Sequence, residues 1–511
     1  MKKILNIINF VRACEPRSED DSFLFTTTKK ELELCREYNF PSTVLLQYDA
    51  LIEEKYVSLI EEFRENTEIG LWLEVVEPLC KAVSIPWRGR FPWDWHNNVG
   101  FLVGYTLEER QLLIDEAFRK FKETYGFYPK SCGSWHIDAY SLQYMKEKYN
   151  IVASCNCKEQ YGTDGYTIWG GIYSGAYYPS KNNMLCPATT KENQINVPVF
   201  RMLGADPIYQ YDMNIGDRNA CQHVTSLEPV YGNSGCDGNW VKWYLSENFN
   251  DKGISLSYTQ AGQENSMNWE NISKGLPKQF EIFSEMSKNG QIEILTLEES
   301  GRWFTDSFGM TPPQAQMFDS DINSNRYKTL WYNCKNYRVN VLYEKGNIWI
   351  RDLYLFDESF REKFLSEKEE TPDCQYFNLP VIDGFRFSDK KTRAGLYFCH
   401  HDNKINFSSP WRTFEKDNTA NIYLGEELKI TVSEDSIYIR CNKSNWNLNA
   451  VNAENADIPY ISADGKILKM QFKYYGEEYF KYELKLGKGY FSKTANGFTI
   501  FPEDGEIKII F

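Results

Sequence analysis

Hydrophobic and polar positions alternate along the segment 68–77, EIGLWLEVVE. As a β-strand, this segment puts four aliphatic side chains on one face and places Trp72 and Glu74 on the other. An aliphatic face suits packing beneath helices. An aromatic ring beside a carboxylate suits the inside of a barrel that leads to a functional site. The pattern therefore predicts a barrel strand with Glu74 on its interior side.

Short apolar runs alternate with amphipathic helical patterns from residue 1 to about residue 300. This alternation is typical of parallel β/α units. Eight segments have the composition of strands, the last of them weakly: 4–11, 43–48, 68–75, 131–136, 151–155, 197–203, 254–258 and 293–297. Seven or eight such units predict an α/β fold, a distorted (β/α)7-8 barrel of catalytic type over residues 1–310.

Two helices of this region carry clear end signals. Thr106 and Glu109 form a capping box, an apolar stripe follows, and Gly126 marks the end. A second helix is expected directly after Asp138, in AYSLQYMKEKY. Residues 161–250 are rich in Gly, Asn and aromatic residues with little periodicity, and a long insertion of this kind is expected to build the substrate face of a barrel.

The pattern changes after Thr311-Pro312-Pro313. Apolar and polar residues then alternate in runs such as YRVNVLYEKGNIWIRDLYLF, and hairpin signals such as Asp464-Gly465 separate the runs. This part of the chain predicts an all-β antiparallel sandwich, an accessory domain over residues 320–511.

Charge and apolar runs exclude several classes of partner. A net charge of −14 and a pI of about 5.1 argue against nucleic acid or an anionic membrane. No run approaches the ~18 apolar residues of a membrane span. The first residues faintly mimic a signal peptide, but Asn6, Asn9 and Arg12 interrupt the apolar run and no small-residue cleavage site follows. We therefore expect a cytoplasmic protein, and its oligomeric state is left open.

The 13 cysteines are odd in number and irregularly spaced, which favours reduced, buried thiols over a disulfide framework. Cys155 and Cys157 form a close pair, and no second pair completes a zinc site. The chain has only five histidines, and it has neither a nucleophile-elbow motif nor a phosphate-binding loop after its first strand. The sequence therefore predicts no metal and no cofactor.

Three carboxylates lie at or just after predicted strand ends: Glu74, Asp138 and Glu264. The C-terminal ends of barrel strands converge on one mouth, so distant residues meet there. Glycoside hydrolysis needs such a pair, one to protonate the leaving oxygen and one to attack or to activate water. Each also has a structural interpretation: Asp138 as a helix N-cap, Glu74 as the ion-pair partner of a barrel arginine such as Arg12, and Glu264 as a solvated loop residue.

Aromatic residues make up 16% of the chain, which suits either large β-rich cores or stacking on sugar rings. The loop IPWRGRFPWDWHNN sets tryptophans beside polar donors, as a sugar cleft requires, although about half of the tryptophans are expected only to cover the barrel end or dock the sandwich. Asp164, which precedes Gly165, is expected to be a turn residue. The candidate substrate-binding residues are Arg12, Glu15, Trp72, Trp95, His96, Trp135, His136, Asp206, Glu228 and Gln263.

The segment EERQLLIDEAFRKFKETYGFYPKSCGSWHIDAYSLQYMKEKYNIVAS resembles the polysaccharide deacetylase superfamily and its glycosidase relatives. Its order of long helix, Gly-Phe-Tyr-Pro turn, strand, short helix and strand is similar to theirs, and GQIEILTLEESGRWF is similar to the end of such domains. The two-domain arrangement also resembles a bacterial group of unknown function with a deacetylase-like barrel and a C-terminal sandwich. The resemblance implies a distorted barrel and a carbohydrate context.

The same resemblance bears on the chemistry. The deacetylases carry an Asp pair after the first strand and His-x-x-x-His after the third, where this chain has CEPR (14–17) and WLEVV (72–76). Metal-dependent deacetylation by that route is therefore not expected. The glycosidase relatives use carboxylates after strand four and after the last strands, where Asp138 and Glu264 lie.

These features predict a carbohydrate-active enzyme, specifically a glycoside hydrolase that acts on an oligosaccharide or glycan. Asp138 and Glu264 would form the carboxylate pair, and Glu74 would support or replace one of them. Two alternatives stay open. One is a metal-dependent carbohydrate deacetylase with ligands from Asp138, His136 and Glu15. The other is a non-catalytic sugar-binding protein on a barrel that has lost its activity.

Overall fold

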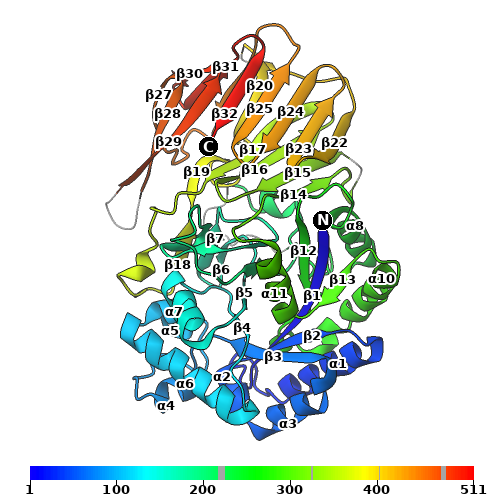
Figure 1. The fold of residues 1–511 in the computed structure, drawn as a ribbon, viewed down its shortest axis with the longest axis vertical. Helices are drawn as coiled ribbons and strands as arrows, with labels where there is room; N and C mark the ends of the chain where they lie inside the picture. The colour runs from blue at the N-terminus through cyan, green and yellow to red at the C-terminus, as the bar shows by residue number, and fades with distance from the viewer. Residues whose placement is uncertain (217–224, 324–325, 402, 474–478) are drawn as a thin grey trace.

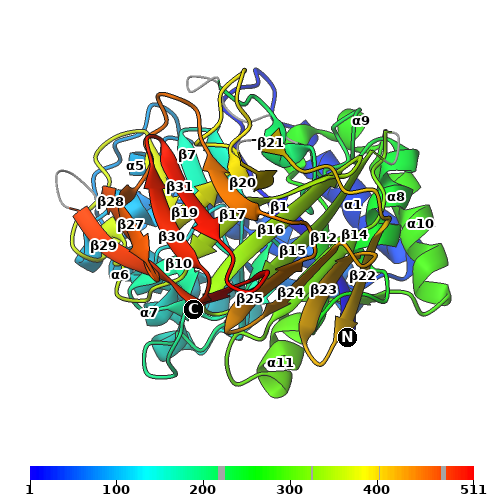
Figure 2. The same cartoon turned by 90° about the horizontal axis from the view of Figure 1, so that it is seen from above.

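The computed structural model describes residues 1–216, 225–323, 326–401, 403–473 and 479–511. Its lower half in Figure 1 is a mostly parallel sheet surrounded by helices, and its upper half consists of antiparallel strands. Seen from above in Figure 2, the C-terminal strands lie over the barrel-like half. The fold is therefore α/β, with a barrel-like unit followed by a large antiparallel sheet, as the pattern along the chain predicted.

The first sheet has the order β12-β1-β2-β3-β4-β5-β11-β8, and β13 also pairs with β1. Its strand pairs are parallel except for β8 with β11. The strands are β1 (Lys2–Val11), β2 (Ser42–Leu46), β3 (Thr67–Trp72), β4 (Ser131–Gly133), β5 (Ala153–Asn156), β8 (Ala176–Tyr177), β11 (Val199–Arg201), β12 (Leu256–Ala261) and β13 (Glu293–Leu295). Each of the eight strands predicted from the sequence overlaps one of these, so the strands are confirmed and their ends are shifted.

The third predicted strand shows the largest consequence of such a shift. β3 ends at Trp72, and the residues that continue its alternation form a loop instead. In this loop the Leu73 amide donates to Gly133 O and the Val75 amide to Gly100 O. The prediction of a strand up to residue 75 was wrong because buried apolar residues continue into the loop, where they pack in the same core.

Helices surround the parallel strands (Figure 1). They are α1 (Phe23–Tyr38), α2 (Tyr48–Ile52), α3 (Glu54–Glu62), α4 (Glu77–Ala82), α5 (Asn97–Gly100), α6 (Leu107–Tyr125), α7 (Ala139–Tyr149), α8 (Gly238–Asn248), α9 (Trp269–Ile272), α10 (Leu276–Lys288) and α11 (Leu297–Ser307). Helix α6 has the predicted capping box, in which the Glu109 amide donates to Thr106 Oγ1 and the Thr106 amide to Glu109 Oε2. Gly126 ends it at a φ of 82°, a left-handed conformation that favours glycine.

The C-terminal sheet is antiparallel throughout and folds back on itself, because β32 pairs with both β25 and β29 and β26 pairs with both β20 and β31. A hydrophobic core fills it. Its strands are β14 (Gln314–Phe318), β15 (Tyr327–Asn333), β16 (Tyr337–Glu344), β17 (Asn347–Leu355), β19 (Leu379–Asp383), β20 (Gly395–His400), β21 (Asn403–Lys404), β22 (Trp411–Lys416), β23 (Thr419–Leu424), β24 (Leu428–Ser433), β25 (Ser436–Cys441), β26 (Trp446–Val451), β27 (Tyr460–Gly465), β28 (Ile467–Lys473), β29 (Tyr479–Lys488), β30 (Tyr490–Thr494), β31 (Gly497–Phe501) and β32 (Glu506–Ile510).

A small sheet joins the two halves of the chain. It has the order β18-β7-β6, with β6 (Gln160–Thr163) and β7 (Tyr166–Trp169) from the long insertion and β18 (Cys374–Phe377) from the C-terminal half. A two-stranded ladder, β9 (Pro179–Ser180) with β10 (Asn183–Pro187), follows in the insertion. The separation into domains 1–310 and 320–511 stays a prediction, since these strands interleave.

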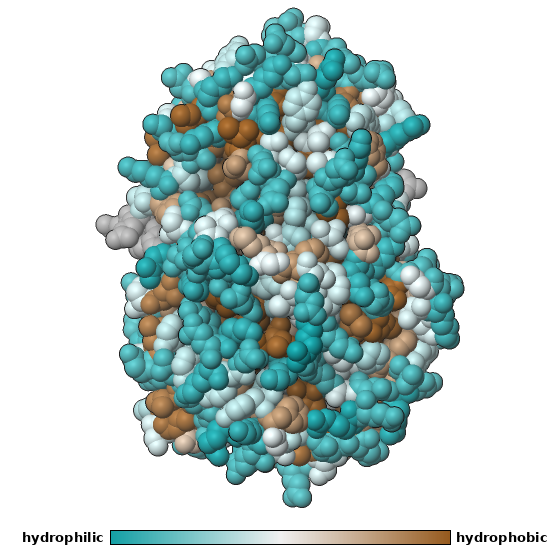
Figure 3. Space-filling model, in the orientation of Figure 1, coloured by the Kyte–Doolittle hydropathy of each residue, from teal (hydrophilic) through white to brown (hydrophobic). Residues whose placement is uncertain are grey.

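The surface in Figure 3 is mostly hydrophilic, and hydrophobic side chains form small separate patches on the face shown. Small patches of this kind are ordinary on folded proteins. Within the described part of the chain, no helix combines the length and the apolar character needed to cross a membrane.

Candidate functional site

The C-terminal ends of four strands converge on one small cavity. Arg12 follows β1, Glu74 follows β3, Trp135 follows β4 and Glu264 follows β12. The cavity has a volume of about 30 Å³, which is the share of about one water molecule. The remaining lining residues are Arg17, Trp93, Trp95, Phe101, Asp164 and Tyr166. We call this cavity and its ten lining residues the mouth.

A buried arginine holds two carboxylates in the mouth. Arg12 Nε and Nη2 donate to the two oxygens of Glu74 at 3.1 and 3.0 Å, and Arg12 Nη1 lies 2.6 Å from Glu264 Oε2. Nη1 donates its hydrogen bond to Ser266 Oγ, so Glu264 Oε2 makes an ion pair without a hydrogen bond. Both carboxylates therefore contact the same planar guanidinium.

Opposed effects set the charge of Arg12. Burial favours its neutral form, but the charges of Glu264 and Glu74 raise its pKa above the ordinary value. Glu74 is 1% exposed and also accepts a hydrogen bond from Gln47 Nε2 at 2.5 Å. Burial raises the pKa of Glu74, and Arg12 opposes that rise. The structural interpretation of Glu74, an ion pair with Arg12, is therefore present in the fold.

Aromatic rings form the walls of the mouth. The Arg12 guanidinium lies 4.2 Å from the ring centre of Trp93, and that of Arg17 lies 5.4 Å from the ring centre of Trp95. Trp135 packs edge-on against Trp72 at 5.3 Å. Trp72 is 1% exposed and does not line the cavity. Trp72 was predicted to contact substrate. Its side chain instead packs in the barrel core, against Trp135.

Two predicted substrate-binding residues, Gln263 and Glu228, form a chain of hydrogen bonds next to Glu264. The side-chain oxygen of Gln263 accepts from the Glu264 amide at 2.8 Å, and Gln263 Nε2 donates to Glu228 Oε1 at 3.2 Å. Ser226 Oγ donates to the other oxygen of Glu228 at 2.7 Å. Burial raises the pKa of Glu228. The structure thus brings Glu228, Gln263 and Glu264 together, although only Glu264 lines the cavity.

Asp164 is a mouth residue that sequence reasoning treated only as a turn residue. It does lie in the turn between β6 and β7, at a φ of 49°, and its backbone oxygen accepts from Asn97 Nδ2. The residue keeps an exposed surface and also lines the cavity. Desolvation of its carboxyl and repulsion from Glu264 raise its pKa. The Asp-Gly pair in the sequence indicates a turn, but nothing in it indicates that Asp164 also lines the cavity.

Asp138 does not reach the mouth. It is fully buried as the N-cap of α7, where Oδ1 accepts from the Ser141 amide at 2.9 Å and Oδ2 from Ser141 Oγ at 2.7 Å. Arg110 Nη1 donates to Oδ1 at 3.1 Å. Asp138 and Glu264 were predicted to line one cavity, and they do not. Both oxygens of Asp138 are already hydrogen-bonded, to the N-terminus of α7 and to Arg110.

Neither predicted histidine lines the cavity. His136 is buried, its Nε2 lies 2.7 Å from Asn97 Oδ1, and its ring stacks on Phe101 at 4.3 Å. Burial lowers the pKa of His136 to about 3, so the ring is neutral at ordinary pH. His96 is the N-cap residue of α5, and its Nδ1 lies 3.6 Å from Asp94 Oδ1.

Two predicted acidic residues are committed to other partners. Both oxygens of Glu15 accept from Arg17, at 2.7 and 2.6 Å. Asp206 is fully buried away from the mouth, where it accepts from the backbone amides of Ile208 and Tyr209 and from Trp240 Nε1. These hydrogen bonds stabilise the loop that contains Asp206. Its position does not support the prediction that it contacts substrate at the mouth.

The donor set of the mouth does not fit a metal ion. Within the described residues, no group of three or more His, Cys, Asp and Glu side chains lies close enough to hold one. The alternative ligands His136, Asp138 and Glu15 are bound to Asn97, Arg110 and Arg17, respectively. The guanidinium of Arg12 stands between the two carboxylates of the mouth, so the cation there is already part of the chain.

Comparison with known proteins gives a match to a family model and similarities to solved structures. Residues 95–308 match the model of a family described as a domain of unknown function with a solved structure, DUF3863. No curated protein matches the chain. The crystal structure of a candidate glycoside hydrolase/deacetylase from Parabacteroides distasonis superposes with a TM-score of 0.52 at 14% identity, covering 74% of this chain and 90% of that one.

Two further structures align with lower scores. One is a candidate polysaccharide deacetylase from Mycobacterium smegmatis, with a TM-score of 0.36 at 10% identity over 60% of this chain and 90% of that one. The other is a candidate polysaccharide deacetylase from Pseudomonas aeruginosa PAO1, with a TM-score of 0.36 at 12% identity over 60% of this chain and 92% of that one. This chain shares its fold with the Parabacteroides protein over the aligned part of each chain.

Proposed function

We propose that this protein is a carbohydrate-active hydrolase, and specifically a glycoside hydrolase that works at the mouth. One observation carries the proposal: two carboxyl groups with opposed environments line the same small cavity. Glu264 lies against the guanidinium of Arg12, whereas the pKa of Asp164 is raised by desolvation and by Glu264. Glycoside hydrolysis needs one carboxyl that keeps its proton and one that stays ionised.

The proposed roles follow from these environments. Asp164 is the general acid that protonates the leaving oxygen, because its raised pKa favours the protonated form. Glu264 is the ionised partner, a nucleophile or the base that activates water. Arg12 stabilises the negative charge of Glu264, and Glu74 holds Arg12 in place through two hydrogen bonds. Glu74 and Arg12 are therefore positioning residues.

The shape of the mouth limits what enters it. A volume of about 30 Å³ accommodates about one water molecule and no sugar ring. A sugar would therefore lie over the entrance, where Trp95 and Arg17 are partly exposed, and present its glycosidic oxygen to the carboxyl groups. Aromatic faces of this kind stack on the C–H faces of sugars. The description of the Parabacteroides protein as a candidate glycoside hydrolase/deacetylase is in keeping with a carbohydrate substrate.

The proposal is tested on a panel of aryl glycosides and oligosaccharides. Glu264→Gln and Asp164→Asn are each expected to lower kcat/KM by about 100-fold or more on the best substrate. Glu147→Gln, an exposed carboxylate on α7, is the matched control and should keep full activity. Full activity in both mouth variants would refute the proposed pair.

The pH profile separates the two roles. A group that must be protonated gives a loss of kcat/KM as pH rises through its pKa, and this basic limb is expected to move or vanish in Asp164→Asn. In Glu264→Gln the rate should fall while this basic limb is kept. Identical pH profiles for the wild type and both variants would contradict the assignment even if the rates fell.

A further inference from the structure

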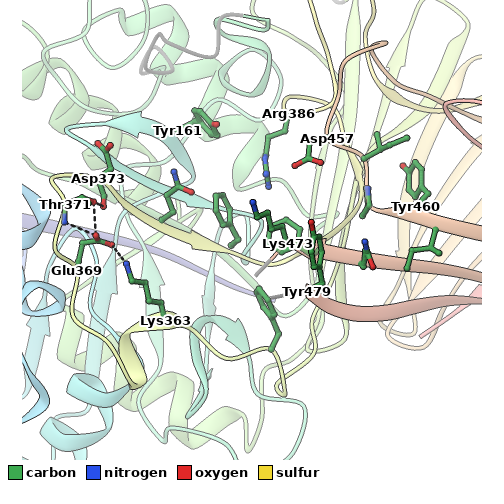
Figure 4. Close-up of a pocket in the computed structure, with 18 residues that line it drawn as sticks. Tyr161, Lys363, Glu369, Thr371, Asp373, Arg386, Asp457, Tyr460, Lys473 and Tyr479 are labelled. Atoms are coloured by element: carbon green, nitrogen blue, oxygen red, sulfur yellow. Dashed lines mark hydrogen bonds and ion pairs between the residues drawn. The ribbon is translucent and has the colours of Figure 1, made fainter. Parts of the chain in front are cut away.

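A cavity of about 650 Å³ lies at the junction of the two halves of the chain, and Figure 4 shows its lining side chains. A smaller cavity of about 160 Å³ continues it, since Tyr161, Arg386 and Asp457 line both. We call the two cavities together the groove. Its volume falls in the range of about 300–1,000 Å³ that is usual for sites that bind small molecules.

The groove and the mouth lie on opposite faces of the sheet β18-β7-β6. Successive side chains of a strand point to opposite faces. On β18, Gln375 and Phe377 line the groove, whereas the ring of Tyr376 lies 5.5 Å from that of His136 on the barrel side. On β7, Tyr166 lines the mouth. One three-stranded sheet therefore forms a wall of both sites.

The two sites also approach each other along the edge of this sheet. Asp373 lines the groove, and its Oδ1 would lie 3.5 Å from a Cβ placed on Gly165. The Cys374 amide donates to Gly165 O at 2.9 Å. Gly165 follows Asp164, which lines the mouth. A chain-like ligand that runs along this edge would therefore contact both sites.

The lining of the groove combines exposed rings with hydrogen-bonding groups. Tyr479 is 54% exposed and Ile461 is 40% exposed, so large apolar surfaces face solvent here without covering protein. Tyr161 and Tyr460 also line the groove (Figure 4). Hydroxyl, amide and carboxyl groups line the same cavity, on Thr371, Asp373, Gln375, Asp457 and Gln471. This mixture suits a ligand with flat apolar faces and hydroxyl edges.

The charges of the groove do not favour an ionic ligand. Lys363 and Glu369 are paired within the wall, where Lys363 Nζ donates to Glu369 Oε2 at 3.2 Å (Figure 4).

 The remaining bases, Arg386 and Lys473, reach toward the centre of the cavity (Figure 4) and are matched in number by the acids Asp373 and Asp457. A lining without a dominant sign of charge favours a neutral ligand over an anion or a cation.

One buried donor of the groove lacks an acceptor. The guanidinium of Arg386 lies over the rings of Phe377 and Phe472, at 4.7 and 5.7 Å from their centres. Its Nη1 is buried and has no hydrogen-bond partner in the protein. A buried polar group without a partner is costly, so a ligand hydroxyl beside Arg386 would remove a penalty as well as add a bond.

We propose that the groove binds a stretch of neutral oligosaccharide, as a second carbohydrate site separate from the mouth. The choice of a carbohydrate rests on the function proposed above, whereas the site itself rests on the volume, the exposed rings and the free donor of Arg386. The rings of Tyr161 and Tyr479 stack on sugar faces, and Gln375 and Arg386 bind hydroxyl groups. Because the groove shares a sheet edge with the mouth, it selects longer chains over short ones.

Binding is measured by calorimetric titration of the full chain with neutral hexasaccharides: cello-, xylo-, manno- and chito-oligosaccharides. The variant Tyr479→Ala/Gln375→Ala removes two exposed groove side chains, and it is expected to weaken binding of the best ligand by about tenfold or more. Tyr490→Ala removes a comparably exposed tyrosine outside the groove, 49% exposed on β30, and should bind as the wild type does. Thermal unfolding of each variant establishes that it is folded.

The outcomes separate this proposal from the proposed function. Absence of binding to every hexasaccharide by the wild type, or equal binding by the groove variant and the wild type, would overturn the groove as a carbohydrate site. If Glu264→Gln and Asp164→Asn keep full activity while the groove variant loses binding, the groove stands and the mechanism fails. If the groove variant raises KM for long chains only, and leaves kcat on short aryl glycosides unchanged, both stand.

Discussion

At the scale of single residues, the main feature of this protein is a buried arginine that pairs with two carboxylates. Arg12 contacts Glu74 and Glu264 at once and is 1% exposed. Buried charges persist when they are paired and hydrogen-bonded, and removing one partner leaves the other uncompensated. The planar guanidinium serves both carboxylates in a fixed geometry that an ammonium group does not reproduce.

The first prediction concerns Arg12. Arg12→Met leaves two carboxylates without their cation, and we expect it to lower the free energy of unfolding by about 3–5 kcal/mol. Arg12→Lys keeps the charge but loses the paired hydrogen bonds to Glu74, so a smaller loss is expected. Denaturant unfolding at pH 7 measures both. An Arg12→Met variant as stable as the wild type would show that the pair is not coupled to folding.

A second residue, Glu31, is buried on α1 with neither carboxyl oxygen hydrogen-bonded. Burial, and then Glu264, raise its pKa well above the ordinary value of 4.5. Above about pH 4.5 the unfolded chain loses this proton while the folded protein keeps it, so stability falls as pH rises toward the folded pKa.

We therefore predict that Glu31→Gln is more stable than the wild type at pH 8 and nearly equal to it at pH 4.5, because the amide has no proton to lose. Thermal unfolding between these pH values measures the difference. Glu37→Gln, an exposed change on the same helix, is the control and should follow the wild-type curve. A difference between Glu31→Gln and the wild type that does not change with pH would contradict the assignment.

At the scale of elements, the N-terminus of α7 shows how helix capping uses a residue that the sequence also offered for catalysis. Asp138 caps α7 and pairs with Arg110 from α6. Glu362, from the C-terminal half, accepts from the Ala139 amide at 2.8 Å. Burial and the nearby Asp138 raise the pKa of Glu362 to about 8. These groups satisfy the first amides of the helix and leave no free oxygen on Asp138.

The third prediction is that Asp138 contributes to stability and not to turnover. Asp138→Ala removes the cap, worth about 1 kcal/mol, and leaves Arg110 buried without its partner, so we expect a total loss of about 3–5 kcal/mol. Asp138→Asn keeps an oxygen for the Ser141 amide and should lose less. The turnover number per folded molecule, measured below the unfolding temperature, should stay within about twofold of the wild type. A stable Asp138→Asn with kcat reduced 100-fold would place Asp138 in the chemistry instead.

At the scale of the whole molecule, the two halves of the chain complete each other. β18 supplies a parallel partner for β7, and Glu362 accepts from both the Ala139 and Met184 amides. Arg110 Nη1 donates to Phe364 O at 2.8 Å. A barrel-like unit without the C-terminal half would expose β7 as an edge and leave these buried donors without acceptors.

The fourth prediction follows from this interleaving. The full chain is expected to unfold in one calorimetric transition, because the contacts that join its halves are lost together. A fragment of residues 1–312 is expected to be insoluble or largely unfolded. Far-UV circular dichroism and proteolysis of the fragment measure this. A folded, protease-resistant fragment with wild-type turnover would show that the first half is an independent domain.

Local patterns in the chain predicted much of this architecture. The Thr106 and Glu109 capping box is present because both of its bonds lie within one turn of helix. The parallel strands occur where apolar runs occur, although the end of β3 was misplaced, since apolar loop residues beyond Trp72 are as buried as strand residues. The candidate site was predicted in part: Glu74, Glu264 and Arg12 do meet, whereas Asp138 does not join them.

What the sequence by itself determined are the features whose causes are local: the α/β and antiparallel patterns, the helix caps and the order of the strands that precede Arg12, Glu74 and Glu264. Only the tertiary structure decided which carboxylates share a cavity. It tied Glu74 to Arg12, took Asp138 into a helix cap and brought Asp164 from a turn to the mouth. The physical reason is that burial, pairing and pKa depend on neighbours that are distant along the chain, which no local pattern records.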